Sequence, residues 1–119
     1  MYQIEIYEDI YGKSDVIDYF NKLQKSDSKD DRIKIQKIRM YMRLLQEYGL
    51  SLNEPYIKHI EKDIWELRPL RDRFLFAYWN NNKFVILSQF VKKTNKTPRS
   101  EIEKARKLLK ELKMRGDLE

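Results

Sequence analysis

Positively charged side chains are the residues of this 119-residue sequence that are best suited to carry out chemistry. Two arginines flank a predicted turn, and three lysines follow the last strongly apolar segment. These residues are Arg68, Arg73, Lys92, Lys93 and Lys96. Two guanidinium groups that lie close together repel each other unless an anion lies between them, and arginine makes paired hydrogen bonds to phosphate oxygens. We therefore predict a phosphate-binding site.

The net charge of +6 is confined to one part of the chain. Residues 56–99 contain ten lysines and arginines against four aspartates and glutamates, and the remaining residues contain fifteen of each kind. A localised excess of positive charge is typical of a protein that binds a polyanion. The alternative is a solvated basic face that serves solubility alone.

A strand predicted at 64–68 sets the direction in which the first arginine points. Side chains alternate between the two faces of a strand, so its apolar residues face a core while Glu66 and Arg68 face polar surroundings. Arg73 follows across a short turn and can come near Arg68. In the alternative interpretation, the two arginines form ordinary surface ion pairs with Glu66 and Asp72.

Metal and thiol chemistry find no support in the residue types. The chain has no cysteine, and its single histidine, His59, cannot form a metal site alone. The carboxylates lack the paired spacing of a two-metal centre, and no glycine-rich phosphate loop or serine-histidine-acid set is present. We therefore expect no metal and no cofactor. The lack of cysteine also fits a reducing cytoplasm.

The hydrophobic pattern predicts the elements that position these residues. Residues 2–7 alternate apolar and polar side chains, as a half-buried strand does. Two helices follow, of which the first begins after Ser14 and the second runs from Ser28 to Gly49. Their apolar stripes indicate an α-hairpin that covers a sheet. A coiled-coil partner could use the same stripes, but the run is short.

The chain then changes to a β pattern. A weak strand is predicted at 56–60, and stronger strands are predicted at 64–68, 73–79 and 84–91. The segment 84–87 is apolar at every position, which is typical of a central strand that is covered on both faces.

Turn and cap residues complete the prediction. Asn80 to Asn82 predict a hairpin turn, and Thr97 followed by Pro98 predicts the start of a closing helix. The element order is β-α-α-β-β-β-α. We expect one α+β domain over residues 1–119, with a mostly antiparallel sheet of about four strands that is packed by an N-terminal α-hairpin and a C-terminal helix.

No segment predicts secretion or membrane insertion. The N-terminus lacks the basic and apolar regions of a signal peptide. The longest uncharged apolar run, at 74–79, is far shorter than the ~20 residues that a membrane span needs. We therefore expect a cytoplasmic protein with no membrane partner.

Four short motifs occur in and just after the stretch with excess charge. They are W-E-L-R at 65–68, R-x-R-F at 71–74, F-x-K-K-x-x-K-T-P at 90–98 and E-I-E-K-A at 101–105. In combination they resemble the HigB-type, phage-derived branch of the RelE/ParE toxin superfamily. The resemblance implies a RelE-like fold with a twisted sheet.

The resemblance also implies a function. Proteins of this kind are toxins of bacterial type II toxin–antitoxin modules, and those of the RelE and HigB type cut messenger RNA in the ribosomal A site. The implied partners are mRNA, the ribosome and a cognate antitoxin, commonly a helix-turn-helix HigA-like protein, with operator DNA reached only through that antitoxin. ParE-type relatives of the same fold instead inhibit gyrase. A plain nucleic-acid-binding module is a further alternative.

The implied reaction needs neither metal nor added water, because the ribose 2′-OH attacks its own phosphodiester. Orientation and neutralisation of the phosphate charge then supply most of the catalysis. Arg68 and Arg73 would stabilise that charge, and Lys93 would assist the phosphate or the leaving oxygen. Glu66 is the candidate general base, and a lysine of lowered pKa is the alternative.

Four further residues are expected to bind the RNA. Lys92 and Lys96 would hold neighbouring phosphates, and Arg71 belongs to the same basic group. Phe90 would stack on a base, for which packing in the core is the competing role.

Overall fold

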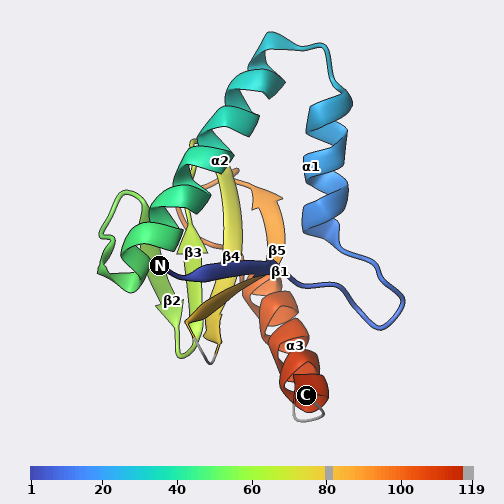
Figure 1. The fold of residues 1–119 in the computed structure, drawn as a ribbon, viewed down its shortest axis with the longest axis vertical. Helices are drawn as coiled ribbons and strands as arrows, with labels where there is room; N and C mark the ends of the chain where they lie inside the picture. Colours follow the sequence, from blue (N-terminus) through green and yellow to red (C-terminus); the bar gives the residue numbers. More distant parts are fainter. Residues whose placement is uncertain (80–81, 117–119) are drawn as a thin grey trace.

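The structure, a computed structural model, describes residues 1–79 and 82–116 and has an α+β fold with a mixed sheet (Figure 1). The strands are β1 (Gln3–Ile6), β2 (Ile57–Glu61), β3 (Ile64–Leu67), β4 (Asp72–Trp79) and β5 (Lys83–Val91). The helices are α1 (Asp15–Lys25), α2 (Lys29–Tyr48) and α3 (Arg99–Gly116), and a short 3-10 turn, η1, lies at Gly49–Ser51. None of the helices in this part of the chain is long and apolar enough to cross a lipid bilayer.

The strand order across the sheet is β1-β5-β4-β3-β2. β1 runs parallel to β5, and all other neighbouring strands are antiparallel. The predicted element order is corrected in one respect, because the weak segment at 56–60 is a full strand at the edge of the sheet. The described chain therefore has five strands, of which four follow the α-hairpin. Pairing with β3 holds β2 in place although its own composition is polar.

The α-hairpin forms where the capping residues predict it. The Ser14 hydroxyl accepts a hydrogen bond from the amide of Ile17 at 3.2 Å, and the Ser28 hydroxyl accepts one from the amide of Asp31 at 3.3 Å. Gly49 ends α2 with a φ of 57°, a conformation that glycine adopts at little cost.

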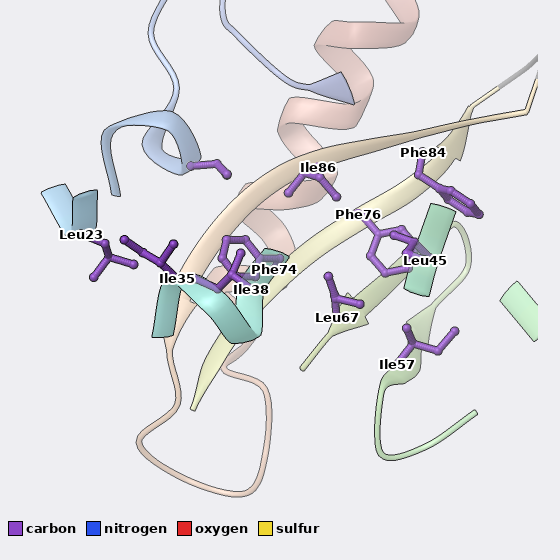
Figure 2. Packing of buried hydrophobic residues seen from close by; sticks show 11 residues of the cluster. Leu23, Ile35, Ile38, Leu45, Ile57, Leu67, Phe74, Phe76, Phe84 and Ile86 are labelled. Atoms are coloured by element: carbon purple, nitrogen blue, oxygen red, sulfur yellow. The ribbon is translucent and has the colours of Figure 1, made fainter. Parts of the chain in front are cut away.

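One face of the sheet packs against this hairpin. Leu23 of α1 and Ile38 and Leu45 of α2 meet Phe74 and Phe76 of β4 in a single apolar cluster (Figure 2). Such side chains each contribute roughly 1.5–3 kcal/mol through burial. The cluster therefore fixes β4 to the hairpin.

The opposite face of the sheet is covered by α3. Ala105 and Leu109 of this helix pack with Val85 and Leu87 of β5. Since β5 also contributes Phe84 and Ile86 to the hairpin cluster, it is buried on both faces, as its uninterrupted apolar run predicted.

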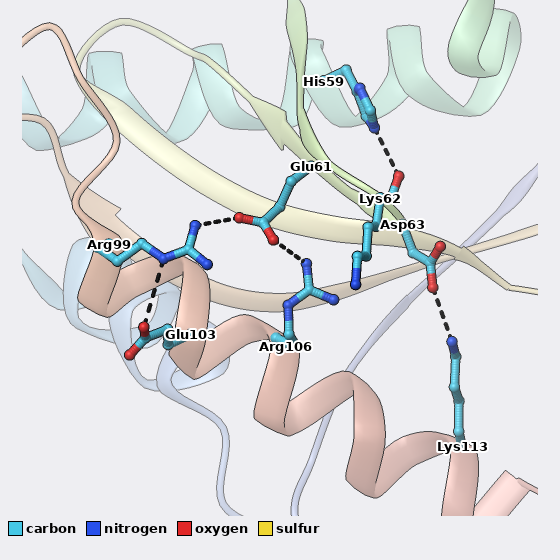
Figure 3. A network of polar contacts seen from close by, with 8 residues as sticks. All are labelled: His59, Glu61, Lys62, Asp63, Arg99, Glu103, Arg106 and Lys113. Atoms are coloured by element: carbon cyan, nitrogen blue, oxygen red, sulfur yellow. Dashed lines mark hydrogen bonds and ion pairs between the residues drawn. The ribbon is translucent and has the colours of Figure 1, made fainter.

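Charged side chains fasten α3 to the β2–β3 hairpin (Figure 3). Glu61 of β2 accepts hydrogen bonds from Arg99 and, at 2.6 Å, from Arg106. Lys113 donates to Asp63 at 2.9 Å. The hydrogen bonds from Arg99 and Lys113 are the main reason that the pKa values of the Glu61 and Asp63 carboxyl groups are lowered. These contacts fix the position of α3, and hence of the segment before it, relative to the sheet.

One predicted turn lies partly outside the described residues, and one predicted helix cap is wrong. Residues 80–81 lie outside the described part of the chain, so of the predicted Asn80–Asn82 turn only Asn82, with a φ of 61°, is described. Pro98 rather than Thr97 is the cap of α3, because its carbonyl accepts the amides of Glu101 and Ile102 at 3.1 and 3.2 Å. The Thr97 hydroxyl has a different partner, in the site described next.

Candidate phosphate-binding site

The ends of three strands bring the predicted arginines together. Leu67 of β3 pairs with Phe74 of β4, and Arg73 pairs with Phe90 of β5. Continuing the antiparallel register by one residue places Arg68 opposite Arg73. Because Leu67 and Phe74 face the α-hairpin, the alternation of side chains puts Arg68, Arg73 and Phe90 on the α3 face.

A single buried carboxylate lies between the two arginines. Glu66 is 1% exposed, and its Oε1 lies 3.2 Å from Nε of Arg68 and 3.8 Å from Nε of Arg73. Its Oε2 accepts a hydrogen bond from the Thr97 hydroxyl at 2.8 Å. Arg68 also lies 3.6 Å from the exposed Glu54, a pair that solvent weakens. One buried negative charge thus serves two guanidinium groups, and the cluster retains positive charge.

The backbone of the β3–β4 turn holds Arg73. Its Nη1 donates to the carbonyl oxygens of Leu70 at 2.8 Å and Asp72 at 2.9 Å. Burial, together with the nearby charge of Arg68, lowers the pKa of Arg73 from its usual value, although an arginine remains charged at neutral pH. Arg73 is therefore a fixed cation that water solvates poorly.

Asp72 does not form the ordinary ion pair of the alternative interpretation. Its side chain turns to the α-hairpin face, where Oδ1 accepts a hydrogen bond from the Tyr19 hydroxyl at 2.5 Å. Among the ion pairs of the described residues, 1–79 and 82–116, none joins Asp72 to Arg73. Of the two carboxylates that the alternative names, only Glu66 pairs with the arginines, and it does so as a buried group and not at the surface.

A small hollow opens in front of the arginines, and we call it the arginine hollow. It is lined by Glu66, Arg68, Arg73, Phe90, Lys92, Thr94, Asn95, Lys96 and Thr97. Its volume of about 10 Å³ is enough for about one water molecule. A phosphate group would therefore bind at the mouth of the hollow, with one oxygen directed toward the guanidinium groups.

The other predicted site residues lie near this hollow with one exception. Phe90, Lys92 and Lys96 line it, and Arg71 is close by because its Nη2 donates to the carbonyl of Lys92 at 2.8 Å. Lys93 is exposed and does not line the hollow. The structure thus brings together every predicted site residue except Lys93.

The lysines of the hollow differ from the cations of α3. Lys113 and Arg106 of α3 are neutralised by Asp63 and Glu61, respectively. In contrast, Lys92 and Lys96 form no ion pair with any residue that the structure describes. Cations that lack a protein counter-charge create a local potential that attracts an anionic ligand.

Two residues of this region were not predicted from the sequence to belong to the site. The Thr97 hydroxyl, predicted to cap a helix, instead donates to Glu66. Lys58 pairs with Glu66 in the β2–β3 register, which places it beside the site on the same face. The strand register identifies Lys58, but no sequence signal shows that the Thr97 side chain turns away from its helix.

His59 lies apart from the arginines. Its Nε2 is 2.7 Å from the carbonyl oxygen of Lys62, and its ring packs against Trp65 in a tilted arrangement, with a centroid distance of 4.6 Å and an interplanar angle of 47°. Over residues 1–79 and 82–116, no group of three or more potential metal ligands gathers.

A sequence model of the family described as phage derived protein Gp49-like (DUF891) matches residues 16–110. The chain belongs to this family. Gp49-like proteins are a RelE/HigB-type toxin family that includes endoribonucleases, and membership implies an antitoxin partner. The match runs from α1 to the middle of α3 and includes the whole arginine hollow. No curated protein matches the chain.

Proposed function

We propose that this Gp49-like protein is the toxin of a type II toxin–antitoxin module and a ribosome-dependent mRNA endoribonuclease of the HigB type. The toxin would be a single RelE-like domain over residues 1–119 and would act in the cytoplasm. The observation that carries the proposal is that Arg68 and Arg73 share the buried Glu66 and lie beside Lys92 and Lys96, which have no carboxylate partner among the residues that the structure describes. A phosphodiester supplies the anion that this arrangement lacks.

The chemistry that fits the site is transfer within the RNA itself. The ribose 2′-OH attacks the adjacent phosphorus, a P–O2′ bond forms and the P–O5′ bond breaks, which leaves a 2′,3′-cyclic phosphate and a 5′-OH. Negative charge grows on the phosphate oxygens in the transition state. Arg73, already fixed by the turn, and Arg68 would donate hydrogen bonds to these oxygens without reorganising, which is how such sites lower barriers.

The surroundings of Glu66 favour a positioning role over the predicted role of general base. Both carboxylate oxygens are engaged, one by Thr97 and one by the two arginines, and the side chain is buried. A base must reach the proton that it removes. We assign to Glu66 the alignment of the guanidinium groups. We assign to Lys92 and Lys96, which line the arginine hollow, the protonation of the leaving 5′-oxygen, while the proton of the attacking 2′-OH passes to water.

The small size of the arginine hollow supports dependence on the ribosome. With a volume of about 10 Å³, it contacts one phosphate oxygen and cannot by itself hold the 2′-OH in line with the leaving oxygen. In-line geometry accounts for much of the rate of such reactions. A ribosome that presents mRNA in a fixed conformation would supply the missing alignment. We propose a helix-turn-helix, HigA-like antitoxin as the partner that neutralises the toxin and contacts operator DNA.

Expression of the full chain in bacteria tests this proposal. The wild-type protein should arrest growth and produce new mRNA 5′ ends, whereas Arg73→Ala and Arg68→Ala should leave growth and transcripts intact. Arg32→Ala, which removes an exposed arginine of α2, is the matched control and should remain toxic. Circular dichroism of the purified variants confirms folding.

Two outcomes would contradict the proposal. Cleavage of mRNA by folded Arg73→Ala and Arg68→Ala would show that the site lies elsewhere. Growth arrest by the wild-type protein with intact mRNA and DNA-damage signalling would instead identify a ParE-type inhibitor of gyrase.

A further inference from the structure

We propose that a second hollow, between β2 and residues 95–97, binds the nucleotide next to the phosphodiester that is cut. The inference rests on the proposed endoribonuclease function and names the contacts that would guide the RNA strand away from the arginines. We call this site the β2 hollow. Its walls include Lys58, Ile60, Asn95, Lys96, Thr97 and Ile102.

The two hollows are adjacent. Asn95, Lys96 and Thr97 line both of them, so the hollows open on either side of one short segment. The β2 hollow has a volume of about 400 Å³, against about 10 Å³ for the arginine hollow. The volume of the β2 hollow lies within the range of pockets that bind small ligands. The arginine hollow therefore suits a phosphate oxygen, and the β2 hollow suits a whole nucleoside.

The strand register gives the direction of the path. Lys58 on β2 lies opposite Glu66 on β3, and Arg73 lies one strand further, on β4. Leu75 is the β4 residue opposite Glu66, and Arg73 lies two residues further along β4. Strands about 4.8 Å apart and a rise of about 3.3 Å per residue therefore separate Lys58 from Arg73 by roughly 12 Å on one face of the sheet. A single RNA strand that leaves the arginines across β3 would meet Lys58.

The side chains of the β2 hollow match the parts of a nucleotide. Lys58 and Lys96 have no carboxylate partner in the described chain, so both are available to a phosphate. Ile60, half-buried, and Ile102, buried, offer an apolar surface to the face of a base. The Asn95 amide carries both donors and an acceptor, which can pair with a base edge.

This combination favours RNA over a lone anion or a protein partner. A lone phosphate would gain nothing from the apolar floor. An acidic peptide could pair its carboxylates with the arginines, but it has no planar base to place against the apolar residues and the Asn95 amide of the β2 hollow. Single strands are bound in just this way, through cations along the backbone and apolar or aromatic faces under the bases.

Binding of a short single-stranded RNA to the full chain tests the inference. The probe carries 2′-O-methyl riboses, which block attack, and its affinity is measured by fluorescence anisotropy over a range of salt concentrations. Lys58→Ala should weaken binding roughly tenfold and reduce the salt slope by about one. Asn95→Ala should change the preference between bases and leave the salt slope as in the wild type. Lys110→Ala, an exposed lysine of α3 that lines neither hollow, is the matched control and should bind as the wild type does.

The same measurements separate failure of the inference from failure of the proposed function. If Arg73→Ala weakens binding while Lys58→Ala behaves like Lys110→Ala, the β2 hollow is not a nucleotide site and the endoribonuclease proposal stands. If Arg73→Ala binds the RNA as tightly as the wild type does, the arginine hollow is not the phosphate site and both proposals fail.

Discussion

The hydroxyl of Tyr19 on α1 donates a hydrogen bond of 2.5 Å to Oδ1 of Asp72 at the start of β4. Asp72 is 1% exposed, and Nζ of Lys34 donates to the same hydroxyl at 3.4 Å. Burial is the main cause that raises the pKa of both the Tyr19 phenol and the Asp72 carboxyl group. The phenol therefore keeps its proton and remains a donor. This contact joins the α-hairpin to the residue that precedes Arg73.

Tyr19→Phe should destabilise the fold by about 1–3 kcal/mol, because it leaves a buried carboxylate without its neutral donor. The free energy of unfolding in urea measures the effect. Tyr48→Phe, which removes the hydroxyl of an exposed tyrosine of α2, is the matched control and should change stability by less than about 0.5 kcal/mol. Equal stability of the two variants would show that the Tyr19 hydrogen bond contributes little.

Asp72→Asn should gain stability relative to the wild type as the pH rises. The folded-state pKa of Asp72 is raised, so its contribution to stability is fully present below the unfolded value of about 3.9 and is lost as the pH rises through the higher folded value. The amide cannot ionise and avoids this loss.

Urea unfolding of both proteins across that pH range measures the difference. Glu61 and Asp63, whose pKa values are lowered, act in the opposite sense, but they are common to both proteins and cancel in the comparison. If the stability of Asp72→Asn relative to the wild type instead falls as the pH rises, the folded protein stabilises Asp72 in its ionised form.

Glu66→Gln should be strongly destabilising and should respond to phosphate. The amide keeps the size of the side chain and an acceptor for Thr97, but it removes the charge between Arg68 and Arg73, at a cost of about 3 kcal/mol. Inorganic phosphate can replace the lost charge, so its addition should raise the melting temperature of the variant more than that of the wild type. Glu103→Gln, a change at an exposed glutamate, is the control. A melting temperature of Glu66→Gln that phosphate raises no more than that of the wild type would contradict the proposed anion site.

Lys96→Ala should reduce cleavage of ribosome-bound mRNA more than Lys93→Ala does. Lys96 lines both hollows, whereas Lys93 lines neither. A lysine that transfers a proton is worth about a hundredfold in rate, so we expect a loss of that order for Lys96→Ala and a loss of less than about tenfold for Lys93→Ala. The reverse order would restore the catalytic role that the sequence predicted for Lys93.

Local signals in the sequence predicted the parts of the fold that local interactions decide. Ser14, Ser28 and Gly49 mark the helix ends because each satisfies backbone groups a few residues away. The alternation in β3 likewise gave the face of Glu66 and Arg68. The parallel pairing of β1 with β5 joins the N-terminal segment to a strand that lies far away in the sequence, and no local pattern reveals it.

The candidate site was predicted less completely, for a similar reason. The arginines were found because their spacing across a turn brings them together. Lys58 was missed because only the pairing register of β2 with β3 places it next to Glu66. The sequence does not predict that register, since β2 has a weak strand propensity. Lys93 was preferred over its neighbours on the resemblance alone, and the direction of a lysine in a connecting segment depends on packing that the sequence does not show.

Asp72 and Arg73 are adjacent in β4 and point to opposite sides of the sheet, so a contact on the α-hairpin face and a contact on the α3 face depend on the same short piece of backbone. A protein that displaced α1 and broke the hydrogen bond from Tyr19 to Asp72 would loosen the backbone around Asp72. The carbonyl oxygens of this backbone hold the guanidinium group of Arg73 on the other face of the sheet. If the chain cleaves RNA as proposed, its activity could then be blocked without any contact with the RNA.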